Sequence, residues 1–111
     1  MSDLKQEHCK PCEGGVDPLD RTAAQNLLSQ ARGWTLNDPA TEISRTYSFK
    51  NFYETMAFVN ALAWVAHKED HHPDLEVGYK RCRVRYTTHA IKGLSMNDFI
   101  CAAKVNDLIG E

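Results

Sequence analysis

The sequence lacks any apolar run long enough to span a bilayer, and its amino terminus, MSDLKQEHCKPC, lacks the hydrophobic core of a secretion signal. We therefore expect a cytoplasmic protein. It also lacks a strong charge of one sign, because 13 basic and 15 acidic residues give a net charge of −2. That balance predicts no direct nucleic-acid binding and no membrane attachment, and we interpret the basic run from Lys80 to Arg85 as a solvated hairpin.

The usual signatures of several enzyme classes are missing as well. There is no GxSxG for a serine nucleophile, no P-loop for a nucleotide and no GxGxxG for a dinucleotide. Disulfides are not expected either, because the four cysteines are unevenly spaced and cytosolic thiols stay reduced. Cys82 and Cys101 fall in a predicted strand and helix, where inert packing is the natural interpretation.

The amino-terminal stretch has little apolar periodicity and contains Pro11, Gly14 and Gly15. We interpret residues 1–16 as a flexible arm and residues 17–111 as a single domain. A CxxC motif, Cys9 to Cys12, lies in this arm and is compatible with zinc binding or redox chemistry. A zinc site needs four ligands, however, and no second local pair follows, so a tail without function is favoured.

Local signals predict three helices and four strands. Helices are indicated by a first N-cap at Asp20 with a stop at Gly33, by a capping-box-like start at Asn51 that leads to His71, and by a capping box at Ser95 with Asp98. Apolar alternation predicts strands over about 34–36, 42–49, 75–79 and 82–88. The order α-β-β-α-β-β-α indicates an α+β fold, a four-stranded antiparallel sheet with three helices on one face.

The histidines are concentrated in one region. His71-His72-Pro73 should mark the end of the second helix, because proline disfavours α geometry in the residue before it. His89 lies at the end of a strand whose hairpin partner begins just after His72, so antiparallel pairing brings the three histidines to one end of the sheet. Imidazole titrates near neutral pH, and a pair of imidazoles that donate one proton and accept another suits a dehydration.

Metal binding is the alternative use of these residues. His67 and His71 are four residues apart on the predicted helix, which suits two ligands. The string HKEDH is not HExxH, however, and Pro73 turns His72 out of helical register. We therefore predict no intrinsic metal site. Asp98 is explained first as a helix cap, and a functional role would be additional to that.

The chain closely resembles the pterin-4a-carbinolamine dehydratase family. The resemblance is carried by a His-His-Pro followed by an aromatic residue, a histidine and an aspartate at set distances, here His71-His72-Pro73, Tyr79, His89 and Asp98. It extends to Thr88-His89 with Gly93-Leu94-Ser95, to Gly33-Trp34, to Phe49-Lys50-Asn51-Phe52 and to Ala57-Phe58. Two departures are His67, where members often have glutamate, and Ala90-Ile91, where some relatives are polar.

The resemblance implies a hydro-lyase that dehydrates 4a-hydroxytetrahydropterin to quinonoid dihydropterin and so recycles the pterin cofactor of aromatic amino acid hydroxylases. The pterin is the substrate, and no metal or other cofactor is implied. Acid/base roles carry over to His71 and His89, and substrate orientation carries over to the third catalytic histidine, His72. The binding pocket would further include Pro73, Thr88 and Ala90, with Asp98 and His67 in support.

The family resemblance also implies assembly and a second function. Members are homodimers or homotetramers, so we expect a homo-oligomer. A hydroxylase is a further expected partner. The alternative function is that of a dimerisation cofactor, or transcriptional coactivator, which binds a transcription factor through the same fold.

Overall fold

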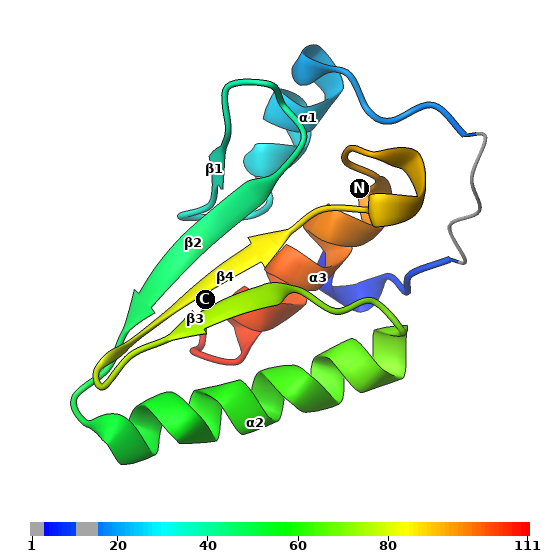
Figure 1. The fold of residues 1–111 in the computed structure, drawn as a ribbon. Coiled ribbons are helices and arrows are strands. Elements are labelled where there is room, and N and C mark those ends of the chain that lie inside the picture. The colour runs from blue at the N-terminus through cyan, green and yellow to red at the C-terminus, as the bar shows by residue number, and fades with distance from the viewer. Residues whose placement is uncertain (1–3, 11–15) are drawn as a thin grey trace.

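The computed structural model describes residues 4–10 and 16–111. The elements are η1 (Leu4–Gln6), α1 (Arg21–Leu28), β1 (Thr35–Leu36), β2 (Ile43–Ser48), α2 (Phe52–Glu69), β3 (Asp74–Val77), β4 (Arg81–Tyr86), η2 (His89–Ile91) and α3 (Met96–Asp107). The four strands form one antiparallel sheet in the order β1-β2-β4-β3. Figure 1 shows the α-helices gathered on one side of this sheet. The predicted α+β class and element order are confirmed.

Side-chain caps fix where the helices begin. The carboxylate of Asp20 accepts a hydrogen bond from Ala23 N at the start of α1, and Asn51 Oδ1 accepts one from Glu54 N at the start of α2. At α3, Ser95 and Asp98 form the reciprocal capping box. Each cap satisfies backbone N–H groups that the first helical turn leaves without partners. All three predicted helix starts are confirmed.

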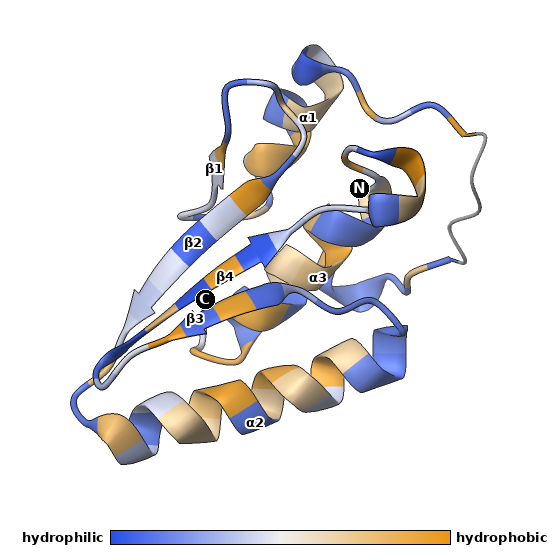
Figure 2. Ribbon diagram, in the orientation of Figure 1, coloured by the Kyte–Doolittle hydropathy of each residue, from blue (hydrophilic) through white to orange (hydrophobic). Residues whose placement is uncertain are grey.

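Alternation along the strands separates the core from the solvent. In β2 and β4 the helix-facing side chains are buried except for the partly buried Arg45, whereas Ser44, Thr46, Arg83 and Arg85 on the other face are partly or fully exposed. The buried set is Ile43, Tyr47, Cys82, Val84 and Tyr86. The same alternation appears as changing colour along β4 in Figure 2. Fully burying a side chain of this size contributes about 1.5–3 kcal/mol.

Asn106 connects α3 to the first half of the chain. Its Oδ1 accepts hydrogen bonds from Trp34 Nε1 at 3.1 Å, Arg45 Nη1 at 2.7 Å and Tyr47 OH at 2.5 Å. Its amide nitrogen donates to the carbonyl of Arg32 at 2.8 Å. A buried amide that is satisfied on both ends fixes the orientation of α3 against β2, and through α3 it fixes the position of Asp98.

The amino-terminal segment differs from the flexible arm that the sequence suggested. Leu4 is only 3% exposed and belongs to the core, because it packs on α3. Lys104 Nζ donates to the carbonyl of Lys5 at 2.8 Å. Residues 4–10 are therefore docked on the domain, whereas Cys12, the second cysteine of the CxxC motif, lies outside the described residues. The sequence carries no signal of this docking, because a single buried leucine creates no apolar periodicity.

Two helices end earlier than predicted. The first ends at Leu28 instead of running to Gly33, since Ser29 Oγ bonds the carbonyl of Asn26 and the following turns use i→i+3 hydrogen bonds. The second ends at Glu69 because Asp70 adopts the left-handed conformation, with φ of 51°.

None of the helices among residues 4–10 and 16–111 has both the length and the apolar character needed to cross a membrane.

The apolar residues of α2 do not all face the core. Phe52 is 44% exposed and Ala63 is exposed too. The helix buries Thr55, Phe58, Leu62 and Glu69. Thr55 is accommodated there because its hydroxyl donates to the carbonyl of Asn51 at 3.0 Å. A helix that is apolar on more than one side leaves its orientation undetermined by sequence.

Candidate functional site

The end of α2 turns His71 into the protein. Asp70 takes the left-handed conformation, and the N–H of His71 bonds the carbonyl of Ala66 at 3.2 Å, which closes the helix end. The side chain of His71 is 12% exposed and its ring stacks on Tyr86, with centroids 5.5 Å apart and planes 9° apart. His71 Nε2 lies 2.6 Å from Asp98 Oδ1. The imidazole is thus held on one face and at one nitrogen.

Asp98 is fully buried and its two oxygens have different partners. Oδ1 faces His71, whereas Oδ2 accepts from the Thr88 hydroxyl at 2.8 Å and from Ser95 N at 3.0 Å. The second oxygen is therefore the helix cap predicted from the sequence. The first oxygen is free to orient a histidine, so capping and orientation are two roles of a single carboxylate.

The charge of Asp98 sets the protonation of His71. Burial works to lower the pKa of His71, but the hydrogen bond and the negative charge of Asp98 work in the opposite direction and prevail, so the pKa of His71 is raised above its ordinary value. As pH rises, such a histidine retains its proton to a higher pH than a free imidazole does. It is suited to act as a general acid.

A cavity of about 530 Å³ opens in front of this pair. Its lining residues are Cys9, Lys10, Lys68, Glu69, Asp70, His71, Thr88, His89, Ala90 and Asn97. Two imidazoles from different elements therefore face one space, His71 just after α2 and His89 at the start of η2. His89 is exposed, so it has solvent contact that His71 largely lacks. A volume of this size is typical of a site for a small organic molecule.

The structure brings only part of the sequence-predicted set to this cavity. His71, Thr88, His89 and Ala90 line it, and Asp98 lies behind His71. Three other predicted residues, His67, His72 and Pro73, are not among the lining residues. His72 is exposed, and His67 is exposed with its ring 5.5 Å from the ring of Trp64. Of the three histidines, His71 and His89 therefore line the cavity, whereas His72, two residues before β3, does not.

Several lining residues were missed from sequence. Glu69 is buried, and its carboxylate accepts a hydrogen bond from Cys9 N at 2.7 Å and lies 3.1 Å from His8 Nδ1. Burial works to raise the pKa of Glu69, but these bonds and nearby Lys104 lower it. Asn97 is likewise buried and binds the backbone of Lys10. Both contacts involve the amino-terminal segment. The charged run beside His71 was a sequence signal for Glu69, and Asn97 had none.

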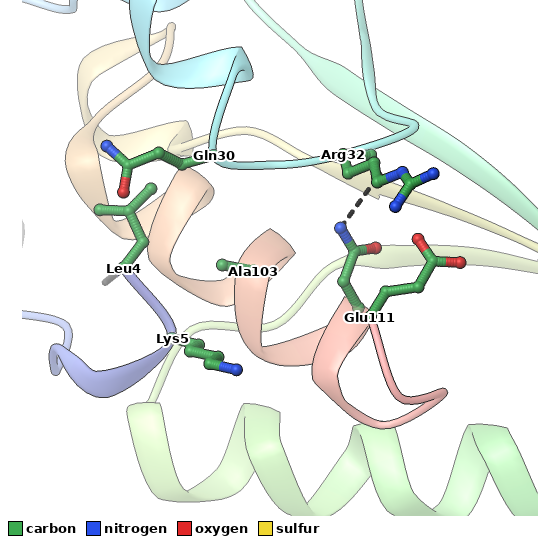
Figure 3. Close-up of a pocket in the computed structure, with 7 residues that line it drawn as sticks. Leu4, Lys5, Gln30, Arg32, Ala103 and Glu111 are labelled. Atoms are coloured by element: carbon green, nitrogen blue, oxygen red, sulfur yellow. Dashed lines mark hydrogen bonds between the residues drawn. The ribbon is translucent and has the colours of Figure 1, made fainter. Parts of the chain in front are cut away.

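A second hollow has fewer side chains suited to catalysis. It has a volume of about 240 Å³ and lies between the amino-terminal segment and the end of α3 (Figure 3). Two of its polar side chains already have partners: Glu111 pairs with Arg45 at 2.9 Å, and Asn106 binds the Arg32 carbonyl. No histidine lines this hollow. Within the described ranges, no group of three or more His, Cys, Asp or Glu residues is arranged to hold a metal ion.

Comparisons with known proteins point to one family. The family model for pterin 4 alpha carbinolamine dehydratase matches residues 17–108. A relative from Nitrosomonas eutropha, provisionally named pterin-4-alpha-carbinolamine dehydratase, is 67% identical over 98% of this chain and 96% of its own length. A Legionella pneumophila relative with the same provisional name is 55% identical over 97% and 96%.

Solved structures give the same fold. A transcriptional coactivator/pterin dehydratase from Brucella melitensis has a TM-score of 0.80 and 31% identity, over 85% of this chain and all of that one (100%). A pterin dehydratase-like protein identified as a RuBisCO assembly factor in the alpha-carboxysome has a TM-score of 0.63 over 72% of this chain and 93% of its own. At 20% identity the second likeness concerns the fold alone.

Proposed function

The chain belongs to the pterin 4 alpha carbinolamine dehydratase family, and on that premise we propose that it dehydrates 4a-hydroxytetrahydropterin to quinonoid dihydropterin by histidine acid/base catalysis. The observation that carries the proposal is the 2.6 Å contact between His71 and the buried Asp98, at the wall of a cavity that His89 also lines. The raised pKa of His71 supports its role as an acid, and the lining of the cavity by His89 supports the use of a second imidazole.

His71 is assigned as the general acid. Its raised pKa keeps the imidazolium populated, and its proton passes to the 4a-hydroxyl, so that the C4a–O bond breaks and water leaves. Asp98 is a positioning residue, because it orients the ring and stabilises the charged form without reaching the cavity. Stacking on Tyr86 fixes the plane of the ring.

His89 is assigned as the base. His89 is exposed and lines the cavity, and in this proposal it removes the proton from N5 while a double bond forms between N5 and C4a. Protons balance over the turnover, because one imidazole gives a proton and the other takes one. Thr88 and Ala90 flank His89 in the lining and shape the binding surface.

The roles of His72, Pro73 and His67 are proposed to be indirect. His72 and Pro73 follow His71 directly and lead into β3, so we assign them to the turn that presents His71. His67 is exposed on α2, with its ring 5.5 Å from the ring of Trp64 and tilted by 32° to it. Replacing His72, Pro73 or His67 is expected to lower the dehydration rate less than replacing His71.

The proposal is tested by following dehydration of synthetic 4a-carbinolamine in a stopped-flow spectrometer with purified protein. A rate well above the uncatalysed one is expected, and it should fall in His71→Ala but persist in His67→Ala, the matched control on the same stretch of chain. A wild-type rate equal to the uncatalysed rate contradicts the proposal.

Assembly and protein binding form the second candidate function. Phe52, Tyr53 and Trp64 on α2 are 44%, 83% and 62% exposed. Exposed aromatic side chains on one helix are typical of a protein-binding surface. We propose a homodimer or homotetramer that uses α2. A coactivator role, as in the name of the Brucella melitensis structure, would use the same kind of surface and would survive replacement of His71 and His89. Sedimentation of the protein alone and with candidate partners separates the two uses.

A further inference from the structure

Two thiols from distant parts of the chain meet behind the cavity. Cys9 Sγ and Cys101 Sγ are 3.4 Å apart and form a sulfur hydrogen bond, although the residues are 92 positions apart in sequence. Cys101 lies in α3 and is fully buried, whereas Cys9 is half-buried and lines the cavity. A reagent in the cavity therefore reaches Cys9 first, and Cys101 is the thiol placed to react with the product.

The backbone on both sides of Cys9 is held in place by buried side chains. Glu69 Oε1 accepts from Cys9 N at 2.7 Å. Asn97 makes a reciprocal pair with Lys10, accepting from its N–H at 3.0 Å and donating to its carbonyl at 2.7 Å. Two buried polar side chains are thus committed to this short segment, and the result is a sulfur that faces α3. Cys9 Sγ is also 3.7 Å from the carbonyl of Asn97.

The thiol pair is close to the groups that support His71. Tyr86, on which the His71 ring stacks, has a buried hydroxyl with no well-formed hydrogen bond among the described residues. The pKa of Tyr86 is raised, first by burial and then by the neighbouring Cys101. The hydrogen bond from Cys101 and then burial raise the pKa of Cys9. We expect a change at Cys101 to affect His71 through Tyr86, because the Tyr86 ring packs against the His71 imidazole.

We propose that Cys9 and Cys101 are an oxidation site, at which a hydroperoxide converts the two thiols to a disulfide that ties residues 4–10 to α3 and slows the dehydratase. In the first step Cys9 sulfur takes an oxygen from the peroxide, giving a sulfenic acid and one molecule of water or alcohol. In the second step Cys101 sulfur attacks Cys9 sulfur, the S–O bond breaks and water leaves. Two thiol hydrogens are lost in all, and the peroxide is the species reduced.

The geometry gives the functional consequence. A disulfide requires the sulfurs to approach to about 2.05 Å, so they must move together by ~1.3 Å from their present contact. That motion shifts Cys9 and Lys10 in the cavity wall and perturbs Tyr86 under His71. A misplacement on the order of 1 Å near a reacting group is enough to lower a catalytic rate. This consequence for rate depends on the proposed function, whereas formation of the disulfide does not.

The test treats full-length protein with hydrogen peroxide and reads the bond and the rate separately. We expect the intact mass to fall by about 2 Da, and nonreducing peptide mapping to join Cys9 to Cys101. The melting temperature should rise by roughly 5–15 °C, since the bond closes a loop of almost the whole chain. The dehydration rate should fall at least about threefold and return when dithiothreitol is added.

Three variants make the result specific. Cys82→Ala is the matched control, because Cys82 is another fully buried thiol, in β4 and outside the cavity lining, and it should leave the response intact. Cys12→Ser should also retain the Cys9–Cys101 bond. Cys9→Ser should abolish both the bond and the reversible rate loss. Cys9 is replaced in preference to Cys101 because it is only half-buried, so the variant is expected to fold.

Two outcomes overturn the proposal. One is an oxidised wild-type protein in which Cys9 is joined to Cys12 or stays unpaired. The other is a protein with the Cys9–Cys101 bond and an unchanged dehydration rate, which removes the regulatory effect. If the reduced protein has no dehydratase activity at all, the proposed function fails, but mass and peptide mapping still decide whether the oxidation site exists.

Discussion

Replacing Asp98 with Asn separates its capping role from its role at His71. The amide is nearly isosteric, and one oxygen remains to accept from Thr88 and Ser95. The lost element is the negative charge 2.6 Å from His71 Nε2 in a fully buried position. A hydrogen bond to a charged group contributes about 1.5–3 kcal/mol, and breaking a buried pair costs about 3–5 kcal/mol. We therefore expect Asp98→Asn to fold with a clearly reduced melting temperature.

The effect on rate follows from the pKa of His71. Asp98 raises this pKa, so without the charge burial dominates and the pKa of His71 falls. Less imidazolium is then present at neutral pH, and the rate should fall by about 10²–10⁴-fold, the typical contribution of general acid/base catalysis. As pH rises, the dehydration rate should begin to fall at a lower pH in the variant than in the wild type. Stopped-flow pH profiles and an NMR titration of His71 measure both effects.

The sign of the stability effect is also determined. A histidine whose pKa is raised on folding adds stability that is complete below its unfolded pKa, near 6.5, and is lost as pH rises through the folded value. The stability gap between wild type and Asp98→Asn should therefore be larger in mild acid than in mild alkali. Ser95→Ala is the control, since it weakens the same cap by about 1 kcal/mol without removing the charge. A folded Asp98→Asn protein with the wild-type pH profile would refute the reasoning.

Three further predictions concern the other histidine, the amino terminus and metals. His72→Ala should lower the rate much less than His71→Ala, because His72 is exposed and outside the cavity lining; equal losses in the same assay would contradict this. Deleting residues 2–10 should lower both the melting temperature and the rate, because Leu4 is in the core and Cys9 lines the cavity; unchanged values would restore the dispensable arm expected from sequence. Prolonged EDTA treatment should leave the rate unchanged, and a loss that zinc restores, supported by elemental analysis, would indicate a metal enzyme.

Much of the fold was predictable because its signals are local. Asp20, Asn51 and Ser95 are side chains that bond nearby backbone groups, so their position in the sequence fixes the helix starts. The β3–β4 hairpin was predictable for the same reason, since strand alternation and a short turn are local signals, although the strands run over 74–77 and 81–86 instead of 75–79 and 82–88. These signals were enough to bring His71 and His89 to one end of the sheet.

The remaining features depend on long-range packing. Leu4 becomes a core residue only because α3 offers a complementary surface, and nothing near Leu4 in sequence encodes that surface. Pro73 set a limit for α2, but the left-handed residue Asp70 ended the helix sooner and so decided which of two adjacent histidines faces inward. The contact between Cys9 and Cys101 joins residues 92 positions apart, and it depends on the docking of the amino-terminal segment.

The most direct test of the central claim is the dehydration rate of a His71→Ala/His89→Ala double variant, shown by circular dichroism and melting temperature to be folded. If these two imidazoles give and take the protons, the double variant should dehydrate the 4a-carbinolamine at close to the uncatalysed rate, and each single variant should lie between it and the wild type. A folded double variant that works at the wild-type rate would contradict the account.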